Sequence, residues 1–392
     1  MSKPEANAAS HDASAESRIP FNRPSMVGNE AVYMMDAVRL GHAAGDGAYT
    51  RKCRMLLEEA LSLSAALLTT SCTHALELAA ILLNISPGDE VIVPSFTFVS
   101  TANAFVLRGA KPVFADIRED TLNMDETALE ALVTANTRAV VPVHYAGIGC
   151  EMDEICRIAA AHSVPVVEDN AHGLFGKYRG RYLGTFGELA TLSFHETKNF
   201  SCGEGGALLI NDQQYVNRAE IVREKGTNRS AFFRGAVDKY TWVDIGSSYP
   251  PSDILAAYLL AQLEARDAVL AARRRVWETY HEQLSSWAKA FGAKQPTVPA
   301  HCESSYHMYH LVLPTARDRD ALIEHLRRRN ILAVFHYVPL HLSPMGLQLG
   351  GQPGQCPVAE SISERLVRLP FFNSLLYHDQ MRVIDAVVSF SR

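Results

Sequence analysis

Seven short apolar runs dominate residues 65–211, and they constrain the fold more than any other feature of the chain. Each run is continuous rather than alternating, which is typical of strands buried on both faces. The runs are residues 65–68, 91–93, 112–115, 139–144, 164–167, 189–194 and 207–210. Helical patterns lie between them, at residues 74–83, 101–107, 126–133 and 153–162. This alternation predicts an α/β fold with a mostly parallel seven-stranded sheet and helices on both faces.

The pattern changes near residue 253. A long helical stretch covers residues 254–284. Two strand candidates and three helices follow it. The first strand candidate is at residues 308–313 and the first of these helices is at residues 319–329. We therefore expect a large domain over residues 19–253 and a smaller α+β domain over residues 254–392. Residues 1–18 are rich in Ala, Ser and Glu and lack an apolar core, which predicts a disordered tail.

Composition and motifs exclude several function classes. The chain carries 37 Lys and Arg against 43 Asp and Glu, a net charge of −6, which argues against a partner that is nucleic acid or an anionic membrane. No apolar run reaches the ~18 residues of a membrane-spanning helix. The seven scattered cysteines contain no C-x-x-C pair, so we expect reduced thiols, a cytoplasmic location and no metal site. Residues 195–199 lack the second histidine of H-E-x-x-H, and the P-loop, dinucleotide and nucleophile-elbow signatures are absent.

Three features of the predicted sheet carry the chemistry. Ser71 follows a strand and precedes a helix, so it can cap a helix whose first free amides bind an anion such as phosphate, although an ordinary N-cap has the same pattern. Glu168 and Asp169 end a central strand, where α/β sheets bind ligands; an acid there is either a structural partner or the counter-ion of a bound cation. Lys198 follows another strand and precedes the glycine-rich turn 203–206. A phosphate site, an acid for a pyridinium nitrogen and a lysine amine are what pyridoxal phosphate requires.

Longer stretches of the chain resemble a known family. They are residues 71–73, 94–103, 143–147, 168–172, 193–199 and 335–341. In these stretches the chain resembles DegT-type sugar aminotransferases, within the fold-type-I pyridoxal-phosphate enzymes, from about residue 19 to the C-terminus. The resemblance implies pyridoxal 5′-phosphate, with pyridoxamine 5′-phosphate as the half-reaction form, and a homodimer with shared active sites.

The resemblance also assigns cofactor contacts. Lys198 would attach the cofactor and move the substrate proton, and Asp169 would pair with the ring nitrogen and keep it protonated. Phe98 would stack on the ring and His172 would lie near its 3-hydroxyl, although either residue type is also common in an ordinary core. The expected phosphate contacts are Cys72, Thr73 and Ser193.

One segment departs from the family pattern. Family members often carry Asn followed by Arg or Lys in the segment that matches residues 246–251, and this loop reaches the neighbouring subunit's cofactor phosphate. Here Ser248 and the pair Pro250-Pro251 stand there instead. Ser248 retains a hydrogen-bond donor, whereas Pro250 has no backbone N–H to donate.

Residues 223–230 and 237–242 resemble one branch of the family, the dTDP-4-amino-4,6-dideoxygalactose transaminases of surface-polysaccharide biosynthesis (enterobacterial common antigen or O-antigen type). This implies transfer of the amino group of L-glutamate to dTDP-4-dehydro-6-deoxy-D-glucose, which gives dTDP-4-amino-4,6-dideoxy-D-galactose and 2-oxoglutarate. A solvated charged loop is the alternative interpretation of the basic segment. The candidate substrate-binding residues are Lys225, Arg229, Arg234, Lys239, Tyr240, Trp242, His336, Tyr337 and His341.

Three alternatives remain open at this point. A related aminotransferase would give the 4-amino-glucose epimer or a 3-amino sugar, because motifs around Lys198 do not specify which face of the sugar is presented. A sugar dehydratase of the same fold typically has histidine at the lysine position, so Lys198 disfavours it. A non-catalytic regulatory protein on this fold is disfavoured by intact Lys198 and Asp169.

Overall fold

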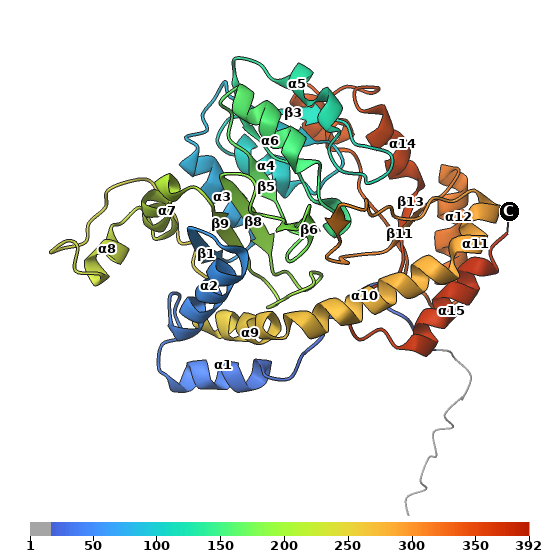
Figure 1. Cartoon of the computed structure of the whole chain (residues 1–392), viewed down its shortest axis with the longest axis horizontal. Helices are drawn as coiled ribbons and strands as arrows, with labels where there is room; N and C mark the ends of the chain where they lie inside the picture. The colour runs from blue at the N-terminus through green and yellow to red at the C-terminus, as the bar shows by residue number, and fades with distance from the viewer. Residues whose placement is uncertain (1–16, 392) are drawn as a thin grey trace, which may run out of the picture.

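The computed structural model describes residues 17–391. The tail expected over residues 1–18 therefore lies almost wholly outside the described residues. Figure 1 shows a central sheet surrounded by helices, with a C-terminal group of helices beside it and α7 and α8 at the opposite end of the molecule.

The central sheet contains the seven expected strands. Their spatial order is β1 (Ala65–Thr69), β9 (Gly206–Ile210), β8 (Leu189–Ser193), β5 (Val167–Asp169), β4 (Thr137–Val140), β2 (Glu90–Pro94) and β3 (Lys111–Ala115). The two halves of the sheet meet at isolated parallel bridges between Val140 and Val166 and between Val143 and Asp169. Strand β9 runs antiparallel to both neighbours, whereas the other described pairings of this sheet are parallel. The predicted mostly parallel α/β sheet is confirmed.

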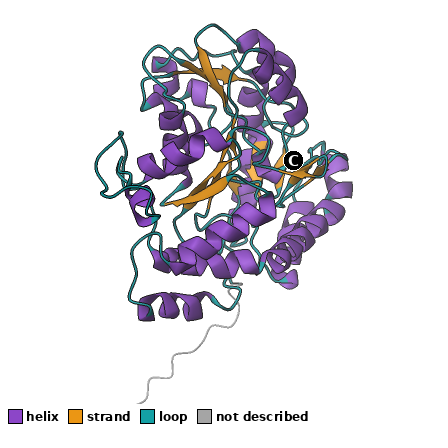
Figure 2. Ribbon diagram, turned by 60° about the vertical axis from the view of Figure 1, so that its left-hand side comes forward, coloured by secondary structure: helices purple, strands orange, loops and turns teal. Residues whose placement is uncertain are grey.

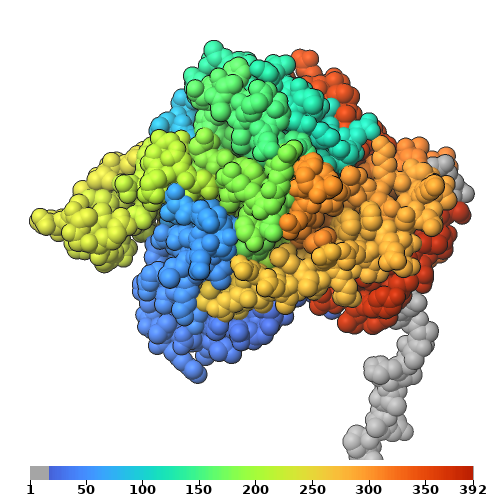
Figure 3. All heavy atoms as spheres, in the orientation of Figure 1, coloured from blue at the N-terminus to red at the C-terminus, as the bar shows by residue number. Residues whose placement is uncertain are grey.

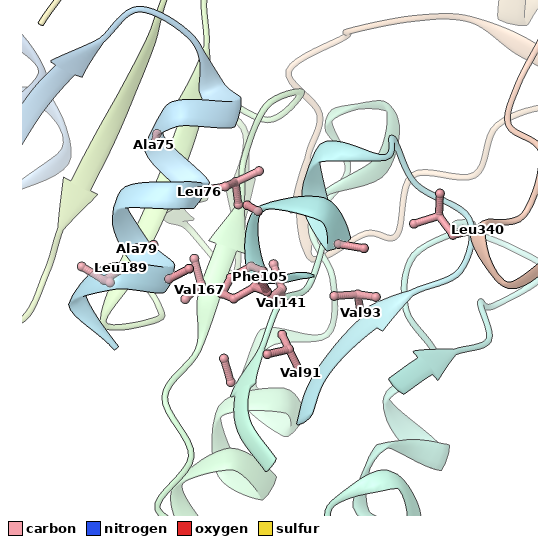
Figure 4. Packing of buried hydrophobic residues seen from close by; sticks show 14 of the residues in the cluster. Ala75, Leu76, Ala79, Val91, Val93, Phe105, Val141, Val167, Leu189 and Leu340 are labelled. Carbon is pink, nitrogen blue, oxygen red and sulfur yellow. The ribbon is translucent and has the colours of Figure 1, made fainter. Parts of the chain in front are cut away.

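Helices cover both faces of this sheet, as Figure 2 shows. Successive residues of a strand point to opposite faces, so each strand contributes to two cores. On one face, α3 (Cys72–Leu82) and α4 (Ser100–Val106) pack over the strands, and Figure 4 shows Ala75, Leu76 and Ala79 of α3 near Val167 and Leu189. On the other face, α2 (Ala48–Leu61) and α9 (Asp253–Glu264) bury the remaining strand residues, and α6 (Met152–Ala161) covers the β2–β4 half.

The C-terminal part builds a second, smaller sheet. Its order is β11 (His310–Val312), β13 (Leu366–Arg368) and β12 (Val334–Phe335), with both outer strands antiparallel to β13. Around it lie α10 (Arg266–Gln283), α12 (Ala316–Arg327), α14 (Pro357–Arg365) and α15 (Tyr377–Val388). Ile19 packs into the same core, and its amide donates to the Asn330 carbonyl. Helix α9 was expected to begin the smaller domain, but it packs on the large sheet. The domain boundary near residue 253 stays a prediction.

Several elements differ from the expected ranges. The stretch 254–284 is interrupted at Ala265 between α9 and α10, and residues 126–133 form a 3₁₀ turn (Glu126–Ala128) followed by α5 (Leu129–Leu132). The 14-residue helix α2 was not expected from the sequence, and neither were several shorter or isolated elements. They are α1 (Glu30–Arg39), α7 (Val216–Arg223), α8 (Arg229–Phe233), α11 (Ser285–Phe291), α13 (Pro344–Gln348), the small sheet of β10 (Cys302–Glu303), β6 (Lys177–Tyr178) and β7 (Arg181–Tyr182), β13, and the 3₁₀ turns Tyr145–Gly147, Gln213–Tyr215 and Leu340–Leu342.

The segment of α8 and the loop after it projects from the body of the molecule, as the space-filling view in Figure 3 shows. Within residues 17–391, no helix combines the length and the apolar character needed to cross a bilayer.

Candidate active site

A cavity of about 540 Å³ lies between the carboxyl ends of β5 and β8, the start of α3 and the C-terminal sheet. Residues from both ends of the chain line it, including Phe21 and Phe371. Nine of the predicted site residues are part of this lining: Cys72, Thr73, Phe98, Asp169, His172, Ser193, Lys198, His336 and Tyr337. The fold therefore brings together side chains that lie more than 250 residues apart in sequence (337 − 72 = 265).

Lys198 lies in the loop that follows β8. The next residue, Asn199, fastens this loop to the C-terminal part: its Nδ2 donates to the Ser305 carbonyl at 2.7 Å and its Oδ1 lies 2.9 Å from His307 Nδ1. Burial lowers the pKa of Lys198 to about 8, opposed by the charge of Asp169 and reinforced by that of Arg368. A large fraction of the amine is therefore unprotonated and nucleophilic slightly above neutral pH.

Asp169 presents its carboxylate to the cavity. The Thr101 hydroxyl donates to its Oδ2 at 2.7 Å, and the backbone amide of Ala171 donates to its Oδ1 at 3.2 Å. These two donors orient the carboxylate and leave accepting capacity for a cation on the cavity side. Sequence reasoning missed Thr101, although it lies within the family-like stretch 94–103 and occupies the first turn of α4.

Glu168 has a different environment. It is fully buried, lies 2.8 Å from His144 Nε2 and accepts three backbone amides between residues 184 and 187. Neighbouring strand residues point to opposite faces of a sheet. Glu168 therefore lies in the protein interior and accepts backbone hydrogen bonds there, while Asp169 lines the cavity. Of the two interpretations weighed for this pair, the structural one describes Glu168.

The start of α3 is the predicted anion site. The Ser71 hydroxyl caps the helix by accepting the His74 amide at 3.1 Å, while Cys72 and Thr73 begin the helix and line the cavity. A Cβ on Gly206 would lie 2.3 Å from the Ser71 carbonyl carbon and 2.4 Å from the Cys72 nitrogen. Only glycine lets β9 pass this close to the turn. Cys72 and Thr73 carry the first amides of the helix and line the cavity, where free first-turn amides suit a phosphate.

Aromatic and imidazole rings form the walls. Phe98 is 57% exposed, so it is not a core residue, and its ring centroid lies 6.4 Å from that of Tyr337. His172 is buried and stacks on His307 at 4.1 Å, and its Nδ1 has no hydrogen-bond partner within the described chain. Burial places the pKa of His172 well below its usual range, so the ring is neutral. This orphaned nitrogen is free for a polar group of a bound ring.

Some residues of the motif 335–341 line the cavity, and another lies in the protein interior. His336 and Tyr337 line the cavity, and His336 Nδ1 lies 2.9 Å from the Tyr145 hydroxyl. His341 is fully buried, outside the lining, with Nδ1 2.5 Å from Ser95 Oγ and Nε2 2.9 Å from Glu360. Its ring nitrogens are therefore already engaged.

The basic segment lies away from the cavity of its own chain. Acidic neighbours pair with much of it: Lys225 is 2.8 Å and Arg229 is 3.5 Å from Glu224, and Arg234 is 2.8 Å from Glu220. The other candidates are outside the lining and exposed, namely Lys239, Tyr240 (55%), Trp242 (77%) and Ser248. Substrate contact by the basic and aromatic residues of this segment stays a prediction, and so does contact between Ser248 and the cofactor phosphate of the neighbouring subunit.

The residues of the cavity fit pyridoxal phosphate. One cavity holds a buried lysine with a lowered pKa, a carboxylate with oriented oxygens, a helix start of the kind that suits an anion, and an orphaned imidazole nitrogen. Across residues 17–391 no group of His, Cys, Asp and Glu side chains is arranged to hold a metal ion.

Comparisons with known proteins agree with this chemistry. The sequence pattern of the DegT/DnrJ/EryC1/StrS aminotransferase family matches residues 26–388. The GDP-perosamine synthase of Escherichia coli O157:H7 is 31% identical over 378 residues, which cover 95% of this chain and 98% of the relative. Among solved structures, the putative sugar aminotransferase Spr1654 of Streptococcus pneumoniae superposes in its apo form with a TM-score of 0.88 at 26% identity, covering 95% of this chain and 97% of that one. Its PMP and PLP forms superpose with TM-scores of 0.88 and 0.87. DesV of S. venezuelae gives a TM-score of 0.87 at 29% identity, covering 96% of this chain and 100% of that one.

Proposed function

The chain belongs to the DegT/DnrJ/EryC1/StrS aminotransferase family, and from this premise we propose that it transfers the amino group of L-glutamate to C4 of dTDP-4-dehydro-6-deoxy-D-glucose. The products are 2-oxoglutarate and dTDP-4-amino-4,6-dideoxy-D-galactose. The protein is a pyridoxal-phosphate-dependent enzyme of the sugar-aminotransferase type. The observation that carries the proposal is the presence of Lys198, Asp169 and the start of α3 in one cavity.

Asp169, Lys198 and the start of α3 each have a task in this reaction. Pyridoxal phosphate supplies a carbonyl that accepts the amino group and a ring that takes up electrons from the substrate carbon. Asp169, oriented by Thr101, holds the proton of the ring nitrogen. Lys198 attaches the cofactor and carries the proton at the substrate carbon, for which its lowered pKa is suited. The first-turn amides of α3 hold the phosphate.

The proposed assembly is a homodimer whose two active sites are shared. Phe98 borders the cavity yet is largely exposed in the single chain. The projecting segment after α8 carries the exposed aromatic side chains of Tyr240 and Trp242. A second copy that covers these groups would close the cavity and bring basic and aromatic side chains to the nucleotide.

We propose a cytoplasmic location and a role in making an amino sugar for surface polysaccharides. All seven cysteines lie in the described part of the chain and are unpaired, which is usual in a reducing compartment. The polysaccharide assignment depends on the branch-like segments 223–230 and 237–242.

Proton NMR of the product tests the proposal. Purified enzyme is incubated with L-glutamate and dTDP-4-dehydro-6-deoxy-D-glucose, with the GDP-linked keto sugar in parallel because one relative is named for a GDP sugar. We expect a dTDP product with a small coupling between H3 and H4, which reports an axial amino group at C4. A large coupling would identify the 4-amino-glucose epimer, and amination at C3 or only of the GDP sugar would also contradict the proposed product. If neither sugar is aminated while glutamate converts the cofactor, the keto-sugar substrate is a different one.

A further inference from the structure

Asn199, the residue after Lys198, connects the lysine loop to a distant part of the chain. It is buried, its Nδ2 donates to the Ser305 carbonyl at 2.7 Å, and its Oδ1 lies 2.9 Å from His307 Nδ1. Ser305 lies 106 positions further along the sequence. A buried amide that is bonded through both of its ends has one orientation, so these two bonds define where the loop lies next to its lysine.

The orientation of this amide also determines the tautomer of His307. A carbonyl oxygen only accepts hydrogen bonds, so the amide nitrogen of Asn199 must face Ser305 and its oxygen must face His307. Nδ1 of His307 is therefore the donor and carries the proton. Burial is the main reason that the pKa of His307 lies well below its usual range. The ring is thus neutral, and its Nε2 carries no proton.

The segment that receives these two bonds is held in place by other contacts. Arg273 of α10 is 2% exposed, and its guanidinium donates to the Tyr306 carbonyl at 2.8 Å and to the His307 carbonyl. The Ser305 hydroxyl donates to the His172 carbonyl at 2.5 Å, and the rings of His307 and His172 stack at 4.1 Å. Both of these rings line the cavity. The segment is therefore a firm support behind one wall of the cavity.

The environment of the Lys198 amine requires that its loop stay against this support. Burial is the main cause of the lowered pKa of Lys198, which Cys72 and Asp169 oppose and Arg368 reinforces. If the loop moved outward, the amine would regain contact with water, and its pKa would return toward the ordinary value of about 10.4. A group that keeps the loop in place therefore also determines how much of the amine is free at neutral pH.

Asn199 occupies the position of such a group. Among the described residues it is not part of the cavity lining, so it acts on the chemistry only through its neighbours. Resting on the proposed attachment of the cofactor to Lys198, we propose that Asn199 is a positioning residue that holds this amine in the cavity. Its bonds to Ser305 and His307 supply the hold. The alternative is that the two bonds stabilise the fold and have no effect on the amine.

Competitive acetylation of the full-length apoenzyme measures the pKa of this amine without cofactor or turnover, with the Lys198 peptide followed by mass spectrometry. Asn199→Ala removes both bonds. Asn211→Ala is the matched control, because Asn211 lies outside the lining and its Nδ2 donates to two carbonyls, at 3.2 Å and 2.7 Å. We expect the titration midpoint of Lys198 to rise by at least about one pH unit in Asn199→Ala, since the amine regains water, and to stay unchanged in the control. An unchanged midpoint in Asn199→Ala, or an equal rise in both variants, would overturn the proposal.

Attachment of pyridoxal phosphate gives a second measurement on the same variants. Below the midpoint, each pH unit of increase in the midpoint reduces the unprotonated fraction about tenfold. We therefore expect borohydride trapping at pH 7 to be at least about tenfold slower in Asn199→Ala than in wild type and unchanged in Asn211→Ala. Equal rates in Asn199→Ala and wild type would contradict the proposal. If wild type forms no adduct at Lys198, the proposed function fails, and the acetylation measurement still decides whether Asn199 holds the amine.

His307→Phe tests the same contact from its other side. Phenylalanine keeps a ring against His172 but cannot donate to Asn199, so trapping should slow by at least about threefold. Because Asn199→Ala removes the same bond, the double variant should be no more than about twofold slower than the slower single variant. Fully multiplied losses in the double variant would overturn the proposal. Thermal unfolding shows which variants fold; if Asn199→Ala does not, His307→Phe decides alone, and wild-type trapping rates in it would overturn the proposal.

Discussion

Glu168 and Asp169 are neighbours in the chain, but they face opposite sides of the strand that carries them. Glu168 is surrounded by backbone amides and His144, whereas Asp169 keeps an open side toward Lys198. Successive side chains of a strand point to opposite faces, so one of the two carboxylates has a structural role and the other belongs to the candidate site. At the scale of single residues, burial then sets reactivity, because desolvation is the main cause of the lowered pKa of Lys198.

The pH dependence of cofactor attachment follows from that pKa. Only the unprotonated amine reacts, so attachment of pyridoxal phosphate to the apoenzyme becomes faster as pH rises through about 8. An ordinary lysine would show the same rise near 10.4. The measurement is borohydride trapping after a fixed short time between pH 6 and pH 10.

The matched variant for this experiment is Lys198→Ala. It should trap no cofactor at this position and lose steady-state turnover entirely. A midpoint above pH 9.5, or turnover retained by Lys198→Ala, would contradict the assignment of Lys198 as the attachment residue.

At the scale of elements, the predicted phosphate site depends on how closely β9 approaches the start of α3. Gly206 lies against the backbone of Ser71 and Cys72, at distances that leave no room for a side chain. The anion site therefore belongs to a contact between two elements that are about 130 residues apart in the chain (206 − 72 = 134), and the helix start alone does not define it.

Gly206→Ala tests this contact. The added methyl group must push β9 from the turn, so we expect a loss of about 1–3 kcal/mol in the free energy of unfolding, as for other overpacked interiors. We also expect faster release of the cofactor, measured by absorbance after gel filtration. Gly149→Ala is the control, because there the methyl group meets side chains at 3.0 Å and 3.1 Å rather than backbone. It should destabilise less and retain the cofactor; equal release by both variants would contradict the role given to Gly206.

At the scale of the whole molecule, the cavity-lining and the exposed candidate substrate residues form two groups that one chain does not bring together. His336 and Tyr337 line the cavity, while Tyr240 and Trp242 lie on the projecting segment. If both groups contact one substrate, the second group must enter the cavity of a neighbouring copy. Shared sites are thus a geometric requirement of the predicted substrate contacts.

Subunit mixing measures this directly. Lys198→Ala and Trp242→Ala chains are each expected to be impaired, the first in all turnover and the second in use of the nucleotide sugar. Unfolding and random reassembly of a 1:1 mixture should restore about a quarter of wild-type activity, because half of the symmetric dimers then contain one intact site. No gain on mixing would contradict the sharing of sites. Tyr377→Ala, which removes an exposed aromatic ring from α15, is the control for lost surface area.

Much of the fold could be predicted because strands buried on both faces are continuous apolar runs. All seven strands of the large sheet follow from that pattern, and the predicted run 139–144 continues past the end of β4 as an isolated bridge between Val143 and Asp169. Strand β13, which carries Arg368, and the pairs β6 and β7 are too short for any periodicity to identify. They are strands because their backbones pair with neighbouring strands, which their own short sequences do not indicate.

The sequence by itself determined the sheet, the lysine and the acid, because short-range patterns and motif order are properties of neighbouring residues. Only the tertiary structure decided that Glu168 has a structural role, that His341 is engaged in the interior, and that Arg368 and Thr101 join the site. The physical reason is that burial and hydrogen bonding depend on residues far away in the chain. A pattern that spans a few positions contains no information about them.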